Sequence, residues 1–125
     1  MSTKLHLGTR KGLITVERNS AGWQIGKPSF LGISIPMLLP DTRDGTLYAA
    51  VEHGHFGTKF HASHDGGATW EERTCPAYPP KPDDASEVIN FVNQELIPWT
   101  LKKIWALEAG TKDGELWCGT MPGGL

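Results

Sequence analysis

Short runs of apolar residues recur along the chain, and turns containing Gly, Pro or Asp separate them. Runs of this length between turn-forming residues are typical of β-strands. Two Asp-Gly pairs, at positions 44–45 and 113–114, each follow an apolar run and precede another, which predicts tight hairpins. The pattern therefore predicts an all-β protein built of short antiparallel strands.

The strand pattern repeats. Three segments, which begin at Leu5, Leu47 and Leu116, share a strand, a Gly-containing loop and a second strand. The matched pairs are Gly8-Thr9 with Gly119-Thr120, and Gly12-Leu13 with Gly124-Leu125. The first two copies each continue into a turn and a tryptophan, Trp23 and Trp70. Leu47 follows Leu5 by 42 residues, which is close to the length of a propeller blade, about 40–50 residues.

Residues 74–100 interrupt the repeat, because Leu116 follows Leu47 by 69 residues and the excess falls in this segment. It contains five prolines, and its first half is expected to be irregular because proline removes a backbone donor. In its second half, apolar residues fall at helical spacing over 87–96, with Asp84 or Ser86 as a candidate cap. Two interpretations of this half remain open, a short helix and an irregular loop.

Residues 63–70 read Ser-His-Asp-Gly-Gly-Ala-Thr-Trp and match the pattern S-x-D-x-G-x-T-W. The five fixed positions are Ser63, Asp65, Gly67, Thr69 and Trp70. We expect the glycines to allow positive φ, Asp65 to accept hydrogen bonds across the turn, and the Trp70 ring to be buried. The alternative is a catalytic or metal-binding Asp65. A structural role is favoured, because the first copy of the turn keeps Trp23 but has Arg18 at the aspartate position.

The phrases GTRKGL, LYAAVEHGHFG and SHDGGATW resemble the Asp-box (BNR-repeat) β-propellers of the sialidase-like superfamily. Within that group the chain is similar to bacterial WD40/YVTN/BNR-like repeat proteins, often labelled glycosyl hydrolases, and the resemblance covers essentially the whole chain. It implies a partial propeller of four-stranded antiparallel blades, with a Pro-rich insertion. One incomplete propeller domain would occupy 1–125, with the outer strands of the ring-closing blade in 4–25, a complete blade in 33–73, the insertion in 74–100 and the first half of the next blade in 101–125.

Two blades and a fraction cannot close a ring. The rest of the propeller is therefore expected from a longer chain of which this is an N-terminal portion, or from further copies of this chain. Three tryptophans are expected to fill the core between blades: Trp99, Trp105 and Trp117.

In an up-and-down blade, successive loops alternate between the two ends of the sheet. The 53–57 loop and the 74–100 insertion are thus expected at one end, and long insertions on one face of a repeat array mark a binding face. The candidate ligand-binding residues are Arg10, Lys11, His53, His55, Lys59 and Tyr78. His53 and His55 project to the same side of an extended chain, so a metal site, a ligand contact and a structural role all remain open. No cofactor is expected.

Three functions are compatible with these residues. The first, which we favour, is a module that binds a glycan or a protein through the face with the 53–57 loop and the insertion. The second is a glycoside hydrolase-like enzyme whose catalytic groups lie partly in other blades, and the third is a structural assembly role without a small-molecule ligand. No catalytic residue is identified. True sialidase activity is disfavoured, since the Arg-Ile-Pro signature is absent and Arg10 is the one arginine expected on that face.

The net charge and the cysteine content limit the classes of partner and the compartment that we expect. The formal net charge is −2, which gives no electrostatic reason to expect nucleic acid or an anionic membrane. No apolar run approaches the roughly 20 residues that span a bilayer, and the first residues lack a signal-peptide core. Because the two cysteines, Cys75 and Cys118, do not suggest a disulfide framework, we expect reduced thiols in a cytoplasmic protein.

Overall fold

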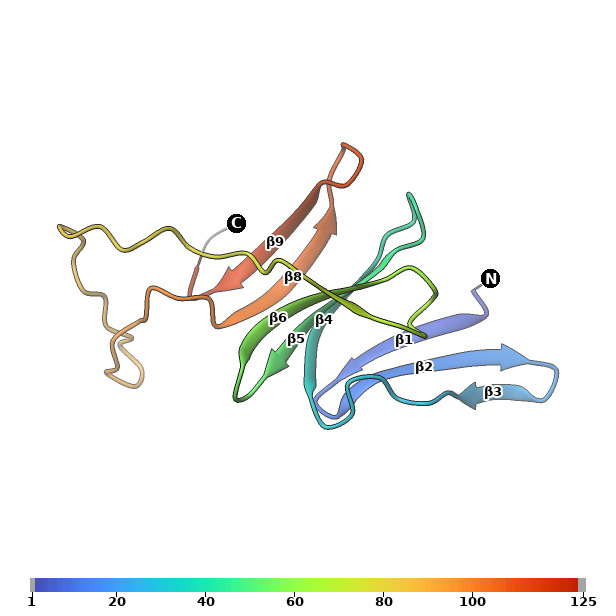
Figure 1. Cartoon of the computed structure of the whole chain (residues 1–125). Coiled ribbons are helices and arrows are strands. Elements are labelled where there is room, and N and C mark those ends of the chain that lie inside the picture. Colours follow the sequence, from blue (N-terminus) through green and yellow to red (C-terminus); the bar gives the residue numbers. More distant parts are fainter. Residues whose placement is uncertain (1, 124–125) are drawn as a thin grey trace.

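The computed structural model describes residues 2–123, which form nine β-strands in three antiparallel sheets (Figure 1). The strand orders are β1-β2-β3, β4-β5-β6-β7 and β8-β9. The strands are β1 (Lys4–Thr9), β2 (Gly12–Asn19), β3 (Gly22–Ile25), β4 (Ser34–Pro40), β5 (Leu47–His53), β6 (Gly57–Ser63), β7 (Glu71–Arg73), β8 (Lys103–Ala109) and β9 (Leu116–Met121). The prediction of an all-β protein of antiparallel strands is confirmed. Residues 2–123 contain no helix, and so none long and apolar enough to cross a membrane.

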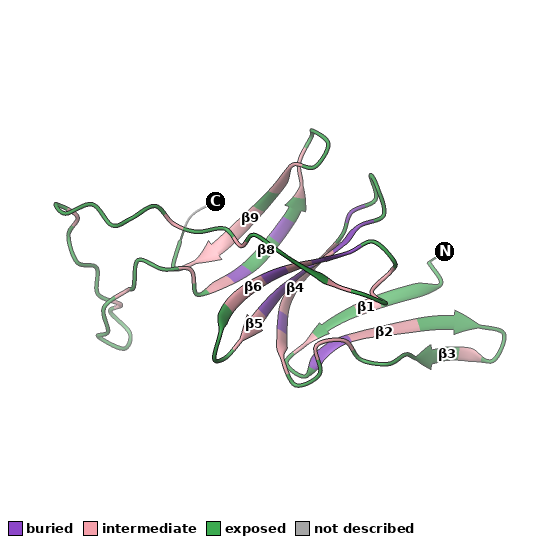
Figure 2. Cartoon of the chain, viewed as in Figure 1, coloured by how far each residue is buried: buried purple, intermediate pink, exposed green. Residues whose placement is uncertain are grey.

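The core lies between the faces of neighbouring sheets. Along β5, Ala49 and Val51 point to one side, where they pack with Leu13 of β2 and Ile35 of β4. Ala50 points to the other side, where its cluster includes Phe60, Ile104 and Leu107. This alternation follows from the two-residue period of a strand. Figure 2 accordingly shows buried residues on the second sheet, on β8 and at the start of β2, while residues 74–100 are mostly exposed.

Small residues allow the first and second sheets to approach closely. A Cβ atom added at Gly8 of β1 would lie 2.7 Å from the backbone oxygen of Ile35 in β4. No side chain can adopt that distance without moving the backbone. The glycine of the repeated Gly-Thr pair at this position is therefore required by packing.

An arginine that the sequence analysis did not single out joins the second and third sheets. Arg43, in the β4–β5 turn, makes a bidentate ion pair with the buried Asp41, with Nη2 2.7 Å from Oδ2 and Nε 2.9 Å from Oδ1. Its Nη1 also donates to the backbone oxygens of Gly110 (2.9 Å) and Lys112 (2.6 Å) in the β8–β9 turn. Hydrogen bonding from Arg43 lowers the pKa of Asp41. The two Asp-Gly turns are thus held together by one guanidinium group.

The helix that was one interpretation of residues 87–96 is wrong. The segment folds back on itself, with an isolated antiparallel bridge between Ile89 and Leu96 and a hydrogen bond from Ile97 N to Val88 O of 2.8 Å. The Asn90 side chain accepts the Val92 N–H over 2.9 Å, which is the local bond by which asparagine competes with helix formation. Gln94 adopts a positive φ of 60°, which also ends any helical path.

Each of the three sheets is open and therefore has two edge strands, and β1 and β9 are among them. Within residues 2–123, β1 pairs with β2 alone and β9 pairs with β8 alone. Apolar side chains are exposed next to these edges, among them Leu5, Trp105 and Trp117. The expected match of Gly124-Leu125 to Gly12-Leu13 lies outside the described residues.

Candidate functional site

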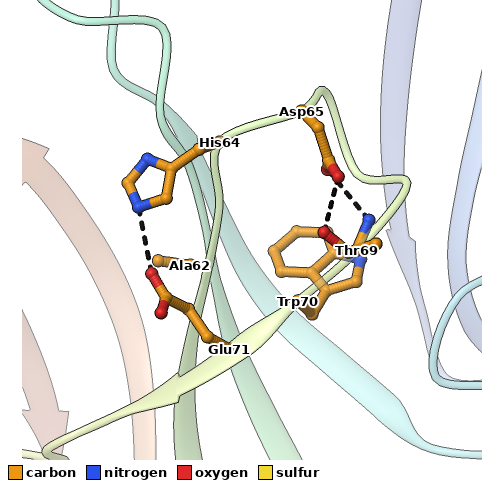
Figure 3. Close-up of a pocket in the computed structure, with 6 residues that line it drawn as sticks. All are labelled: Ala62, His64, Asp65, Thr69, Trp70 and Glu71. Carbon is orange, nitrogen blue, oxygen red and sulfur yellow. Dashed lines mark hydrogen bonds and ion pairs between the residues drawn. The ribbon is translucent and has the colours of Figure 1, made fainter.

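The turn between β6 and β7, residues 63–70, is closed by hydrogen bonds among its own side chains. Ser63 Oγ donates to Asp65 Oδ1 over 2.7 Å and accepts the Gly67 N–H over 2.8 Å. Asp65 Oδ1 also accepts the Thr69 N–H over 2.9 Å, and Oδ2 accepts the Thr69 hydroxyl over 2.5 Å. Figure 3 shows the carboxylate pointing at Thr69. Both carboxylate oxygens are thus used within the turn.

The same turn packs through Trp70 against the β3–β4 connection and the core cluster that includes Leu13 of the first sheet. Its indole Nε1 donates to Gly67 O over 3.1 Å, and its ring centroid lies 5.1 Å from that of Phe30. Ser29 Oγ reaches the same Gly67 oxygen at 3.3 Å. Gly66 and Gly67 have φ values of 73° and 95°, which side chains rarely adopt. These residues therefore fix both the turn and its contact with the neighbouring sheet.

The hydrogen bonds of the turn stabilise Asp65 in its ionised form. The Thr69 hydroxyl contributes most, followed by the Thr69 N–H and the Ser63 hydroxyl, and together they hold the pKa of Asp65 well below its ordinary value of 3.8. A carboxyl group with such a low pKa carries no proton to donate near neutral pH. The arrangement suits a structural role for Asp65 better than a catalytic one.

A pocket of about 300 Å³ lies beside this turn (Figure 3). Its lining residues are Ala62, His64, Asp65, Thr69, Trp70 and Glu71. His64 Nε2 lies 3.0 Å from Glu71 Oε1, and Nδ1 lies 3.2 Å from Thr46 Oγ1. Arg73 in turn binds the Glu71 carboxylate over 2.5 Å. Since these polar groups already bind one another, the pocket leaves few of them for a ligand.

The 53–57 loop brings its two histidines to one aromatic ring. The ring centroids of His53 and His55 lie 4.8 and 4.9 Å from that of Phe56. His53 Nδ1 is buried and makes no hydrogen bond within the described part of the chain. Among residues 2–123, no group of three or more His, Cys, Asp or Glu side chains could hold a metal ion.

The other basic candidates lie apart from the pocket beside the 63–70 turn. Arg10 and Lys11 are exposed in the β1–β2 turn, where the Lys11 backbone oxygen accepts the Gly32 N–H over 2.9 Å. Lys59 of β6 pairs with Glu72 of β7 over 3.2 Å. The structure therefore does not gather the predicted basic and histidine residues into one site.

A larger pocket of about 610 Å³, which we call the insertion pocket, lies between the 74–100 insertion and the chain that follows β9. Apolar side chains predominate in its wall. The lining residues are Tyr78, Pro79, Lys81, Ser86, Glu87, Val88, Leu96, Ile97, Pro98, Trp99, Pro122 and Gly123.

Two aromatic residues anchor the wall of the insertion pocket. The Tyr78 hydroxyl donates to the Gly123 backbone oxygen and lies 2.8 Å from Thr120 Oγ1, which ties the insertion to the end of β9. Trp99 Nε1 donates to Pro79 O over 2.8 Å, which links the two ends of the insertion. Trp99 nevertheless remains 44% exposed. Hydrogen bonds thus fix the position of the wall, while part of the Trp99 indole ring stays exposed.

Of the six predicted ligand-binding residues, Tyr78 alone lines the insertion pocket. The sequence analysis missed Trp99, which was expected in the core between blades but lies in the pocket wall. Its position directly after Pro98 in a proline-rich segment could have indicated an irregular, partly exposed environment. For Lys81 and Glu87, no sequence feature other than their place in the insertion indicated that they line this pocket.

The fold and these pockets define a small all-β protein of antiparallel sheets with one long irregular insertion. No protein-family model and no curated protein matches this chain. The geometry of the two pockets is therefore the basis for a functional proposal.

Proposed function

We propose that this chain is part of an Asp-box β-propeller of the sialidase-like type and acts as a binding module whose ligand occupies the insertion pocket. Two observations support the propeller. The S-x-D-x-G-x-T-W sequence falls on the turn between the third and fourth strands of a four-stranded antiparallel sheet. The three sheets also pack through their faces in chain order, which is the arrangement of blades.

The main support for the binding role is the insertion pocket. Its volume of about 610 Å³ lies within the range of about 300–1,000 Å³ that is usual for ligand sites, and such sites are mainly apolar with a few polar groups. The 63–70 turn has a smaller pocket whose polar groups bind one another. The insertion is thus the better candidate for a ligand.

The lining of the insertion pocket favours binding over glycoside hydrolysis. Most glycosidases place two carboxyl groups about 5–10 Å apart across the scissile bond. Glu87 is the one carboxylate among the described residues that line this pocket, and it pairs with Lys81. Hydrolysis at this site would need a second carboxylate from another part of a complete propeller.

The proposal includes further blades, from a longer chain or from copies of this one. The uncovered edges of β1 and β9 and the exposed Leu5, Leu7, Trp105 and Trp117 support it, because unpaired strand edges and apolar faces are normally covered. Light scattering on a size-exclusion column tests this part. We expect either a discrete closed oligomer or self-association, and a stable, monodisperse monomer would contradict it.

Nuclear magnetic resonance of the ¹⁵N-labelled chain tests the binding site. A panel of short peptides and of oligosaccharides, among them maltotriose and N-acetyllactosamine, is added one at a time. We expect at least one class to shift the Trp99 indole signal and the amides of the insertion pocket. Shifts confined to the 53–57 loop or to the 63–70 turn, or no shift with any probe, would contradict the proposed site.

A further inference from the structure

The polar atoms of the two aromatic residues in the insertion pocket already make hydrogen bonds within the protein. The Tyr78 hydroxyl binds Gly123 and Thr120, and the Trp99 indole N–H binds Pro79 O over 2.8 Å. A sugar needs free donors and acceptors for its many hydroxyl groups, because a buried polar group without a partner is costly. Apart from Ser86 and the paired Lys81 and Glu87, the pocket offers ring faces and proline surfaces, which suit an apolar or aromatic side chain.

Apolar surface continues outward from the pocket along the folded-back segment 88–97. Val88 and Leu96 line the pocket and are 54% and 59% exposed. At the tip of the segment, Phe91 and Val92 are 87% and 83% exposed. Large apolar side chains exposed together on one short segment are typical of interaction sites. It extends the contact area beyond a single bound side chain, as an extended peptide would require.

The insertion also carries an excess of negative charge. Residues 74–100 contain one basic residue, Lys81, against four acidic residues, which leaves a net charge of −3. Lys81 is itself paired with Glu87 at the pocket, so its charge is matched locally. The remaining acidic residues are Asp83, Asp84 and Glu95, and they are exposed. Asp83 and Asp84 lie in the chain between the lining residues Lys81 and Ser86, and Glu95 precedes the lining residue Leu96. An apolar pocket with such acidic chain neighbours is complementary to an apolar anchor with basic neighbours.

We propose that the insertion pocket binds a peptide segment of a partner protein in which an aromatic or large apolar residue is flanked by Lys or Arg. This inference rests on the proposed binding function and specifies its ligand. Aromatic and proline surfaces hold the anchor residue, as in grooves that recognise proline-rich peptides. The acidic residues around the pocket raise the association rate and select basic flanks.

The probe is a synthetic peptide with a central phenylalanine. One proline stands on each side of the phenylalanine, and two lysines stand at each end. Binding is followed by the Trp99 indole signal of the ¹⁵N-labelled chain. We expect replacement of the lysines by glutamates, and separately of the phenylalanine by alanine, to weaken binding at least about 10-fold. Added salt should weaken binding of the lysine peptide, because screening reduces attraction between exposed charges.

The other outcomes separate the two proposals. Equal binding of the lysine and glutamate peptides would contradict the proposed preference for basic flanks. If an oligosaccharide but no peptide shifts the Trp99 signal, the proposal of a peptide ligand is wrong. In both cases the binding site itself survives. If no probe shifts any residue of the insertion pocket, the peptide inference and the proposed function both fail.

A charge variant and a matched control test the acidic surround directly. Asp83→Asn, Asp84→Asn and Glu95→Gln are combined, and Glu108→Gln on the exposed face of β8 serves as the control. We expect the triple variant to bind the lysine peptide about 10-fold more weakly and the control to bind it as the parent does. Unchanged affinity in the triple variant, with an unchanged spectrum outside the insertion, would overturn the role of these charges.

Discussion

The 63–70 turn and the 74–100 insertion use their side chains in opposite ways. In the turn, Ser63, Asp65 and Thr69 satisfy one another, and the Trp70 indole binds within the turn and packs on Phe30. In the insertion, hydrogen bonds fix the rings of Tyr78 and Trp99, but much of the apolar surface around them stays exposed. This contrast indicates that the segment with the recognisable motif maintains the fold, whereas the irregular segment presents the surface that we propose for a ligand.

Trp70→Ala should have the largest effect on stability. The substitution removes a ring that packs on Phe30 and spans the contact between the first and second sheets. We expect a loss of about 3 kcal/mol in the free energy of unfolding, measured by urea denaturation followed by circular dichroism. A loss below about 1 kcal/mol would contradict the structural role given to the turn.

Asp65→Ala should destabilise the protein next most. It leaves the Thr69 N–H and hydroxyl and the Ser63 hydroxyl without the acceptor that they share. We expect the thermal midpoint to fall by roughly 5–10 °C. Glu72→Ala is a matched control, since it removes an exposed carboxylate of the same sheet and should change the midpoint little.

The stabilisation by Asp65 should depend on pH with a definite sign. Its pKa is lowered in the folded state, so the ionised carboxylate stabilises the fold fully above its ordinary pKa of 3.8, and this contribution is lost as the pH falls below that value. The difference in thermal midpoint between the parent and Asp65→Asn should therefore shrink on acidification below 3.8. A difference that grows in this range would show that the sign is wrong.

Trp99→Ala should change binding more than stability. Because Trp99 is 44% exposed and lies in the insertion, we expect less than about 1 kcal/mol of destabilisation. The affinity for the lysine peptide should fall at least about 10-fold. Trp105→Ala on β8, which removes another exposed tryptophan, is the matched control and should leave the affinity unchanged.

Phe91→Ser should have the smallest effect. The side chain lies at the tip of the folded-back segment and is almost fully exposed, so the free energy of unfolding should change by less than about 0.5 kcal/mol. Peptide affinity should fall by about 3-fold, as at the edge of an interface. A drop of several degrees in the thermal midpoint would mean that Phe91 packs against the protein.

The regular part of the fold could be predicted because its signals are local. Asp44-Gly45 and Asp113-Gly114 each provide a glycine with positive φ, at 81° and 74°, for a tight turn. The insertion could not be predicted in the same way. Val88, Phe91 and Val92 fall at helical spacing, but the Asn90 side chain and the positive φ of Gln94 stabilise a folded-back loop instead.

The site was harder to predict than the strands because it depends on contacts between distant residues. Tyr78 reaches Thr120 and Gly123 across 42 and 45 positions, and Arg43 binds Gly110 and Lys112 across 67 and 69 positions. Neither contact leaves a motif in the sequence. The place of Trp99 in the pocket wall likewise depends on its hydrogen bond to Pro79.

The division of roles between the turn and the insertion is tested most directly by measuring thermal midpoint and peptide affinity together in Asp65→Ala and Trp99→Ala. The affinity is measured well below both midpoints, so that each variant is folded. The account predicts a lowered midpoint with retained affinity for Asp65→Ala, and a retained midpoint with lost affinity for Trp99→Ala. The reverse pattern, with binding lost and stability kept in Asp65→Ala, would place the functional site at the 63–70 turn and contradict the account.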